Sequence, residues 1–155
     1  MTVRATQMGA SPTSGVDFTI IAEAQARGKP IRYLETFEQQ MALLAPSDPK
    51  LELATFEAFL KDFRGEGEQF PDIVKAWSDG DQERLAKLTT QSMASDPATK
   101  KSLVDDRNMA WVAPITRMLD DEEGTFLVTV GALHMLGPTG VPALLRARGY
   151  KVDGP

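Results

Sequence analysis

The stretch "FLVTVGALHMLGPTGVPALLRARGYKVD", residues 126–153, decides the fold that the sequence predicts. Residues 126–130 are nearly all apolar and mostly β-favouring, which predicts a strand buried on both faces. Residues 140–148 predict a helix, with a proline in its first turn and Gly149 after its last. "YKVD" predicts a last short strand. Strand, loop, helix and strand form a βαβ unit with a right-handed crossover, so we expect a helix-rich α/β fold with a small sheet.

The chain before this stretch predicts mostly helices. Residues 16–30 fit a helix that Ser14 or Asp17 caps and that Gly28 and Pro30 end. "IRYLE", residues 31–35, predicts a short strand. The residues from 36 to about 101 fit helices over 36–45, 51–63, 70–77 and 80–93. Thr36 and Gln39 have the spacing of a capping box at the first of these helices.

The segment "KKSLVDDRNMAWVAPITRMLDD", residues 100–121, predicts a longer helix. One face of this helix carries a stripe of residues at spacings of three and four, and Arg107 borders the stripe. Pro114 interrupts the segment and predicts a kink near Ala110. The stripe consists of Val104, Asn108, Trp111, Ile115 and Met118.

Composition bounds the function. A length of 155 residues favours one domain, expected over residues 16–155 after an irregular lead-in of residues 1–15. A net charge of −5 argues against nucleic acid and anionic membranes as partners. The absence of cysteine excludes disulfides, zinc–thiolate sites and cysteine nucleophiles. No apolar run reaches the roughly 20 residues of a membrane span, and the first residues lack the apolar core of a secretory signal.

The candidate site centres on His134, the only histidine. It lies in the loop 131–140, after the predicted strand, where open α/β sheets bind ligands. The three loop glycines, Gly131, Gly137 and Gly140, permit tight turns and a close approach of a ligand or cofactor. His134 there is a candidate metal ligand, general base or oxyanion donor. The alternative is a hydrogen-bonded histidine in the core.

Three further polar residues are candidates for the same site. Glu35 also follows a predicted strand, and Arg107 and Asn108 border an apolar helix face. A buried arginine needs a partner, so Glu35 or Asp106 pairing with Arg107 for purely structural reasons is the alternative interpretation. The sequence contains no Gly-x-Ser-x-Gly elbow, P-loop or Gly-x-Gly-x-x-Gly motif.

Four blocks in order resemble the TraB/GumN family. The first three are "GVD" with "ARGKP", "YLETFEQQ", and "DDRN" followed by a tryptophan. The fourth is the C-terminal stretch, which carries a Gly-x-x-His motif. Its matching residues are Gly131, His134, Leu136, Gly137, Pro138, Gly140, Val141, Leu144, Leu145, Gly149, Tyr150 and Val152.

The resemblance implies an α/β fold shared with erythromycin-esterase-like and ChaN-like proteins, and a metal-dependent hydrolase of peptidase type. It implies that His134 binds a divalent metal (Mn, Co or Zn), with Glu35 a weaker candidate for ligand or base. Arg107 and Asn108 would orient ligands or stabilise a developing oxyanion.

The chain resembles only the second half of a family domain that is nearly twice as long and has two Gly-x-x-His motifs. A complete two-histidine site is therefore not expected within one copy. Three alternatives follow from the resemblance. A second copy, or a chain supplying the first half, completes the site, with a peptide or small molecule as ligand; or the protein works differently; or it is a remnant. Relatives are often exported or membrane-attached, and the sequence leaves the compartment of this chain open.

The sequence is also compatible with two functions other than a hydrolase. The chain could be a non-catalytic binding or assembly module that keeps the fold and associates with itself. By analogy with the ChaN-like proteins, it could instead bind haem or another small ligand, with His134 as the axial ligand.

Overall fold

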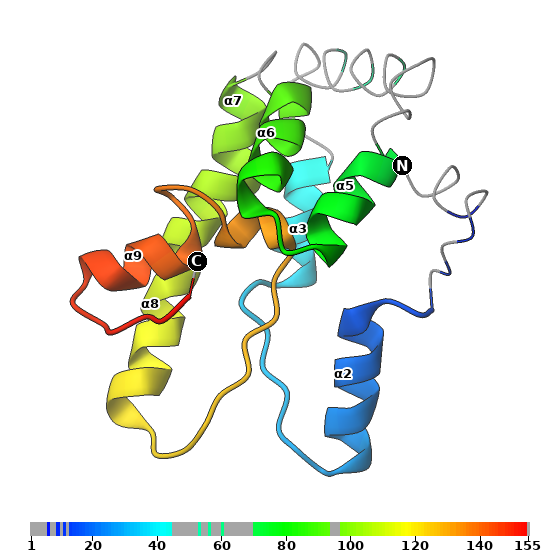
Figure 1. The fold of residues 1–155 in the computed structure, drawn as a ribbon. Helices are drawn as coiled ribbons and strands as arrows, with labels where there is room; N and C mark the ends of the chain where they lie inside the picture. Colours follow the sequence, from blue (N-terminus) through cyan, green and yellow to red (C-terminus); the bar gives the residue numbers. More distant parts are fainter. Residues whose placement is uncertain are drawn as a thin grey trace. The chain divides into compact units, whose positions relative to one another are not determined.

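A computed structural model describes residues 13–44, 70–93 and 97–154, together with Thr6, Gly9, Ser11, Leu53, Phe56 and Leu60. The helix predicted over 51–63 and most of the predicted lead-in 1–15 lie outside the described residues. The chain divides into two compact units, Met1–Phe70 and Pro71–Pro155, which are considered separately below. Figure 1 shows the described helices.

In the first unit, helices α2 (Val16–Ala26) and α3 (Phe37–Leu44) form where the sequence predicts them. Gly28 ends α2 in a left-handed conformation, φ 62°, and Lys29 N–H donates to Ala24 O at 2.9 Å. The N-cap of α2 is Gly15, without a side-chain hydrogen bond, so the prediction of Ser14 or Asp17 as its cap was wrong.

The capping box predicted at the start of α3 is confirmed. Thr36 N–H donates to Gln39 Oε1 at 2.8 Å, and Gln39 N–H donates back to Thr36 Oγ1 at 3.2 Å. The two side chains satisfy donors that the first turn of a helix leaves without intrahelical partners.

Helices also dominate the second unit, and α5 begins at the boundary between the units. The elements are α5 (Phe70–Ser78), α6 (Gln82–Met93), α7 (Pro97–Lys100), a π-helical turn η2 (Lys101–Asp105), α8 (Asp106–Asp121), a 3-10 turn η3 (Ala132–Met135) and α9 (Val141–Ala147). Gly80 and Gly149, both with positive φ, end α5 and α9. Within the described residues, no helix is long and apolar enough to cross a membrane.

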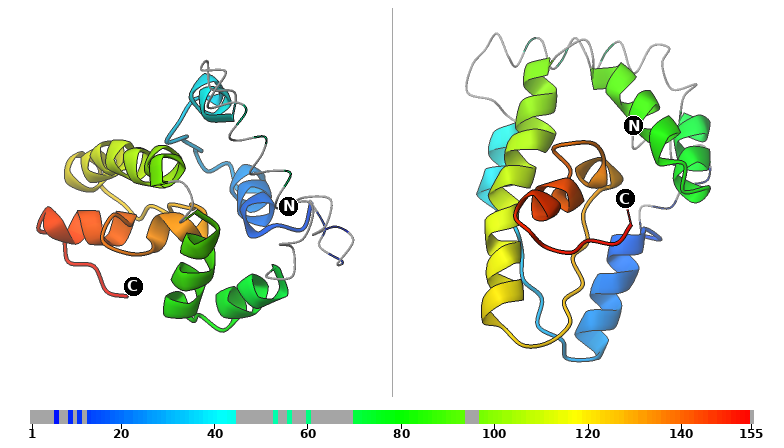
Figure 2. Two further views of the ribbon diagram at one scale, coloured as in Figure 1. Left: turned by 90° about the horizontal axis from the view of Figure 1, so that it is seen from above. Right: turned by 60° about the vertical axis from the view of Figure 1, so that its left-hand side comes forward.

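The predicted stripe on α8 is the centre of this unit. Val104, Asn108, Trp111 and Ile115 are buried, and Met118 is half-buried. Helix α9 packs against α8 (Figures 1 and 2). Val112 and Val141 are also buried. Pro114 lies inside helix α8, which continues on both sides of it.

The predicted α/β fold with a βαβ unit was wrong, because no strand or sheet is present among the described residues (Figure 2). Residues 31–35, 126–130 and 150–153 lie outside helices and are not paired as strands. A strand is stable only beside a partner that completes its ladder of hydrogen bonds, and composition does not specify that partner. Tyr33 and Leu127 are accordingly 79% and 74% exposed instead of buried in a sheet.

Candidate functional site

His134 lies in η3, directly after the Gly-x-x stretch that begins at Gly131. Its own backbone N–H donates to Gly131 O at 2.9 Å, which closes the turn. A β-carbon placed on Gly131 would lie 3.7 Å from His134 Cδ2, so the glycine borders the imidazole ring. The imidazole is buried, with 8% of the residue exposed.

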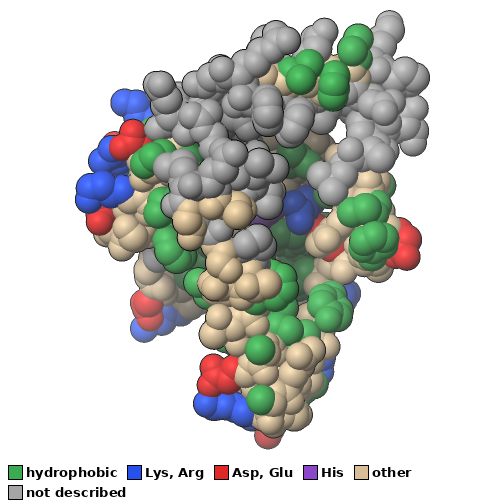
Figure 3. All heavy atoms as spheres, turned by 90° about the vertical axis from the view of Figure 1, so that its right-hand side faces the viewer, with side chains coloured by type: hydrophobic (Ala, Val, Ile, Leu, Met, Phe, Trp, Pro, Cys, Tyr) green, Lys and Arg blue, Asp and Glu red, His purple; other side chains and the backbone are tan. Residues whose placement is uncertain are grey.

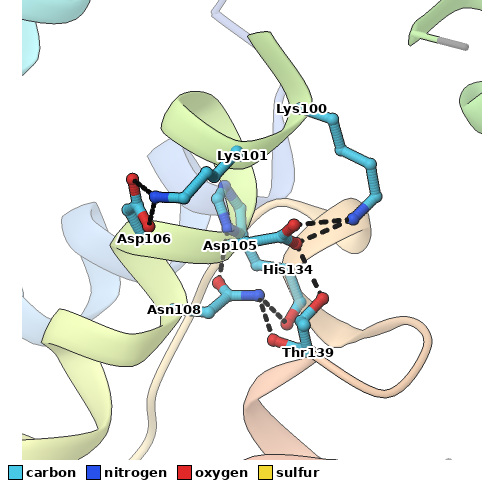
Figure 4. Close-up of polar contacts among 7 residues, drawn as sticks. All are labelled: Lys100, Lys101, Asp105, Asp106, Asn108, His134 and Thr139. Carbon is cyan, nitrogen blue, oxygen red and sulfur yellow. Dashed lines mark hydrogen bonds and ion pairs between the residues drawn. The ribbon is translucent and has the colours of Figure 1, made fainter. Parts of the chain in front are cut away.

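Asn108 on α8 holds the imidazole in place (Figure 4). Asn108 is fully buried, and its Oδ1 lies 2.7 Å from His134 Nδ1. Its Nδ2 donates to Thr139 O at 2.8 Å and to His134 O at 3.4 Å. Backbone carbonyls only accept, so Nδ2 must face them and Oδ1 must face the ring. The imidazole therefore carries its proton on Nδ1, and Nε2 is left as an acceptor.

Arg107 and Trp111 lie beside the same imidazole. Arg107 Nη1 is 3.5 Å from His134 Nε2 and also donates to Leu103 O at 3.1 Å. The guanidinium carbon lies 4.8 Å from the centroid of the Trp111 ring, and the Trp111 and His134 rings are 4.4 Å apart. The contact between Arg107 and Trp111 places a cation over an aromatic face, which is an attractive interaction. The imidazole is therefore in contact with an aromatic ring and, at Nε2, with a guanidinium.

A second polar group lies next to Asn108. Thr139 Oγ1 donates to Asp105 Oδ1 at 2.7 Å, and Lys100 Nζ donates to both Asp105 oxygens at 2.8 and 2.9 Å. Burial raises the pKa of the Asp105 carboxyl, but these hydrogen bonds and the charges of Lys100 and Lys101 outweigh burial. The pKa of Asp105 consequently lies below its ordinary value, and the ionised form is stabilised.

The loop glycines shape the backbone around the imidazole. A β-carbon on Gly140 would lie 2.8 Å from Leu136 O and from Met135 C and O, so no side chain fits there. Gly137 has φ 72°, which favours glycine. The predicted cofactor-binding role of Gly131, Gly137 and Gly140 stays a prediction.

The structure brings Arg107 and Asn108 next to His134, and the predicted catalytic and metal-binding roles of the three stay predictions. Glu35 lies in the first unit, in the segment between α2 and α3, where it lines an open depression. Asp106, a predicted partner of Arg107, instead pairs with Lys101 at 2.6 Å. Pairing of Arg107 with Glu35 stays a prediction.

Sequence reasoning missed Lys100, Asp105 and Thr139. One signal pointed to Asp105, which lies three residues before Asn108 and therefore on the same face of the helix. Thr139 lies directly before the last helix. The N-cap of α9 is Gly140, and the Thr139 side chain contacts Asp105 instead.

Metal-binding side chains are sparse around His134. Within the described part of the chain, no group of three or more histidine, aspartate or glutamate side chains lies close enough to hold a metal. The cluster therefore offers one oriented imidazole, with the Arg107 guanidinium 3.5 Å from its second ring nitrogen, Nε2.

The fold and the site define a helix-rich protein in which a Gly-x-x-His turn presents an imidazole oriented by a buried asparagine. The chain belongs to the TraB/PrgY/gumN family, whose model matches residues 1–154.

Two curated relatives carry the printed name "Uncharacterized protein YbaP", one from Escherichia coli (strain K12) and one from Shigella flexneri. Each is 27% identical to this chain over 153 residues, which cover 94% of this chain and 54% of the relative. The chain thus spans about half the length of the curated relatives that it matches. No solved structure matches it.

Proposed function

We propose that the chain contributes to a hydrolase of peptidase type that uses a divalent metal, Mn, Co or Zn, with His134 Nε2 as one ligand. One observation carries the proposal, namely the 2.7 Å contact between His134 Nδ1 and Asn108 Oδ1. Metal-binding histidines almost always donate their other ring N–H to an oxygen acceptor, which fixes the tautomer. A bound metal supplies Lewis acidity toward the substrate carbonyl.

The described residues around His134 fit one ligand of such a site. A catalytic zinc uses about three protein ligands, so the others must come from outside this cluster. Glu35 and a partner chain, either a second copy or one that supplies further family sequence, are the candidates. The relatives, about twice as long, have room for such residues, which supports this arrangement.

Arg107 acts at His134 Nε2 in two ways. Its guanidinium donors lie where a developing oxyanion next to His134 would be stabilised. Its charge also competes with a metal for Nε2, at a distance of 3.5 Å. Metal binding therefore requires the guanidinium to move off Nε2. Without a metal, Nε2 in this tautomer accepts a proton from water as a general base.

The test combines metal uptake with peptide cleavage. Wild type is expected to bind Mn, Co or Zn at micromolar concentration and to cleave a peptide library when the metal is present. His134→Ala should lose both properties, because the chain has no other histidine. No uptake by wild type would refute the ligand role, and cleavage that a chelator leaves intact would assign His134 to general-base chemistry instead.

Arg107 is tested against a matched arginine on the same helix. Arg107→Leu should lower the cleavage rate, whereas Arg117→Leu removes an exposed arginine of α8 and should leave the rate unchanged. Equal loss in both variants would show that Arg107 acts through overall charge or stability.

A second candidate function is an assembly module. Helix α2 buries none of its residues and exposes Val16, Phe18 and Ile21 by 55%, 59% and 36%. Figure 3 likewise shows hydrophobic side chains at the surface of the face that it draws. Exposed apolar surface of this kind marks interaction sites. Light scattering during size exclusion should then give a dimer or larger species that Phe18→Glu dissociates, and a monomer at every concentration would refute this function.

A further inference from the structure

Thr139 joins two positions of the helix that carries Asn108. Its hydroxyl donates to Asp105 Oδ1 at 2.7 Å, and its backbone carbonyl accepts from Asn108 Nδ2 at 2.8 Å. Asp105 and Asn108 lie three residues apart and so share one face of the helix. The position of the Thr139 carbonyl is therefore set by the bond that its own side chain makes to Asp105.

Asp105 is itself held by Lys100, five residues earlier. Side chains three or four residues apart are neighbours on an α-helix, whereas this ion pair and the Lys101–Asp106 pair both span five residues. The π-helical turn Lys101–Asp105 accounts for the difference, because its hydrogen bonds join residues i and i+5. π-helical turns occur frequently at functional sites.

We propose that Asp105 and Thr139 are positioning residues that set the tautomer of His134 through Asn108. Thr139 O is the nearer of the two acceptors of Asn108 Nδ2, since His134 O lies at 3.4 Å. Once Thr139 is released from Asp105, this acceptor shifts and the Asn108 amide is free to turn over. Nδ2 would then face His134 Nδ1, the ring would have to accept there, and its proton would move to Nε2. Nε2 would lose the lone pair that binds a metal or a proton.

The effect of the tautomer on metal or proton binding at Nε2 rests on the proposed function. The tautomer itself can be observed without any activity. Since His134 is the only histidine, long-range ¹H–¹⁵N spectra of the imidazole contain one set of ring signals. At about pH 8.5, where an ordinary imidazole is neutral, wild type should show a protonated Nδ1 and an unprotonated Nε2. Failure of peptide cleavage with this spectrum intact would refute the proposed function and leave the positioning role standing.

Thr139→Val is the decisive variant, because it removes the hydroxyl and keeps the shape. Its Nδ1 and Nε2 signals should shift toward each other or exchange identities, and Thr139→Ser should restore the wild-type spectrum. Asp105→Ala should give the same shift, and combining it with Thr139→Val should add nothing further. The matched control is Thr116→Val on α8, whose hydroxyl donates to Ala113 O at 3.0 Å outside this network.

A folded Thr139→Val protein with the wild-type imidazole spectrum would overturn the proposal. If Thr139→Val does not fold, Asp105→Ala decides the question by the same spectrum, with Asp106→Ala as its control. Equal shifts in Asp105→Ala and Asp106→Ala would also overturn the proposal, because Asp106 pairs with Lys101 and not with Thr139.

Discussion

Asn108 and His134 lie 26 positions apart in the sequence and share a buried 2.7 Å hydrogen bond that joins α8 to the Gly-x-x-His turn. The same asparagine amide donates to backbone carbonyls of the loop that leads to α9. One side chain thus holds the turn, the ring and the following loop against a single helix.

Asn108→Ala should lower the free energy of unfolding of the second unit by roughly 1–3 kcal/mol, because it leaves His134 Nδ1–H and buried carbonyls without partners. Both tryptophans, Trp77 and Trp111, belong to this unit, so tryptophan fluorescence in urea reports its unfolding. The neighbouring Met109 is 59% exposed, and Met109→Ala should change stability little. Similar losses in the two variants would contradict a special role for the Asn108 amide.

Gly140→Ala should destabilise the second unit by about 1–3 kcal/mol, since the added methyl would overlap backbone atoms that cannot move aside easily. The added carbon would lie 2.8 Å from Leu136 O, whereas a methyl on Gly131 meets His134 Cδ2 at an ordinary 3.7 Å. Gly131→Ala is therefore the control and should be tolerated. Urea midpoints of the two variants check the prediction, which fails if Gly140→Ala is as stable as wild type.

Asp105 should make folding stability depend on acid pH. Burial raises the pKa of the Asp105 carboxyl, but the hydrogen bonds that Asp105 accepts and the neighbouring lysines hold this pKa below its ordinary 3.8 in the folded chain. The folded state thus binds fewer protons than the unfolded state in this range. The contribution is fully present above the ordinary pKa and is lost as the pH falls through the lower folded value.

The free energy of unfolding, measured from neutral pH into the acid range, tests whether this contribution is lost as the pH falls. In Asp105→Asn, the free energy of unfolding should fall less steeply in the acid range than it does in wild type. Asp106→Asn removes an exposed ion pair, which contributes little, and should alter the curve less. A wild-type acid limb in Asp105→Asn would contradict the assignment.

Thr36→Ala should weaken the start of α3 by about 1 kcal/mol, because it deletes one half of the capping box. Thr36→Ser retains the hydroxyl and serves as the control. Amide hydrogen exchange of Glu38, Gln39 and Gln40 reports the first turn directly. Exchange should become faster in Thr36→Ala alone, and unchanged exchange there would show that the cap does not hold this turn.

The parts of the fold that the sequence predicted correctly are those that depend on near neighbours. The capping box of α3 and the glycine ends of α2 and α9 join residues within six positions of each other. The predicted strands failed for the opposite reason. Residues 126–130 have the composition of a strand, but a strand also needs a partner whose position no local pattern specifies.

The same distinction between local and long-range contacts applies to the candidate site. The ordered motif blocks predicted that Arg107, Asn108 and His134 act together, and the structure places them in contact. The bond between Thr139 and Asp105 spans 34 positions and involves residue types common in loops and on helix surfaces. Apart from the position of Asp105 on the same helix face as Asn108, nothing in their local spacing distinguishes them from solvated side chains. The contact between a helix and a loop became visible only in three dimensions.

The extended stretch 126–130 has a consequence for the behaviour of the chain in solution. Its backbone makes no hydrogen bond among the described residues, and Leu127 is 74% exposed. An apolar, β-favouring segment whose backbone has no partner among the described residues is a template for aggregation. Four carboxylates, Asp120 to Glu123, directly precede it and add negative charge that repels further copies. Replacing these four residues by their amides should therefore raise the turbidity of concentrated solutions, and Leu127→Lys should suppress the rise, so that four consecutive acidic residues act as the gatekeeper of this protein's solubility.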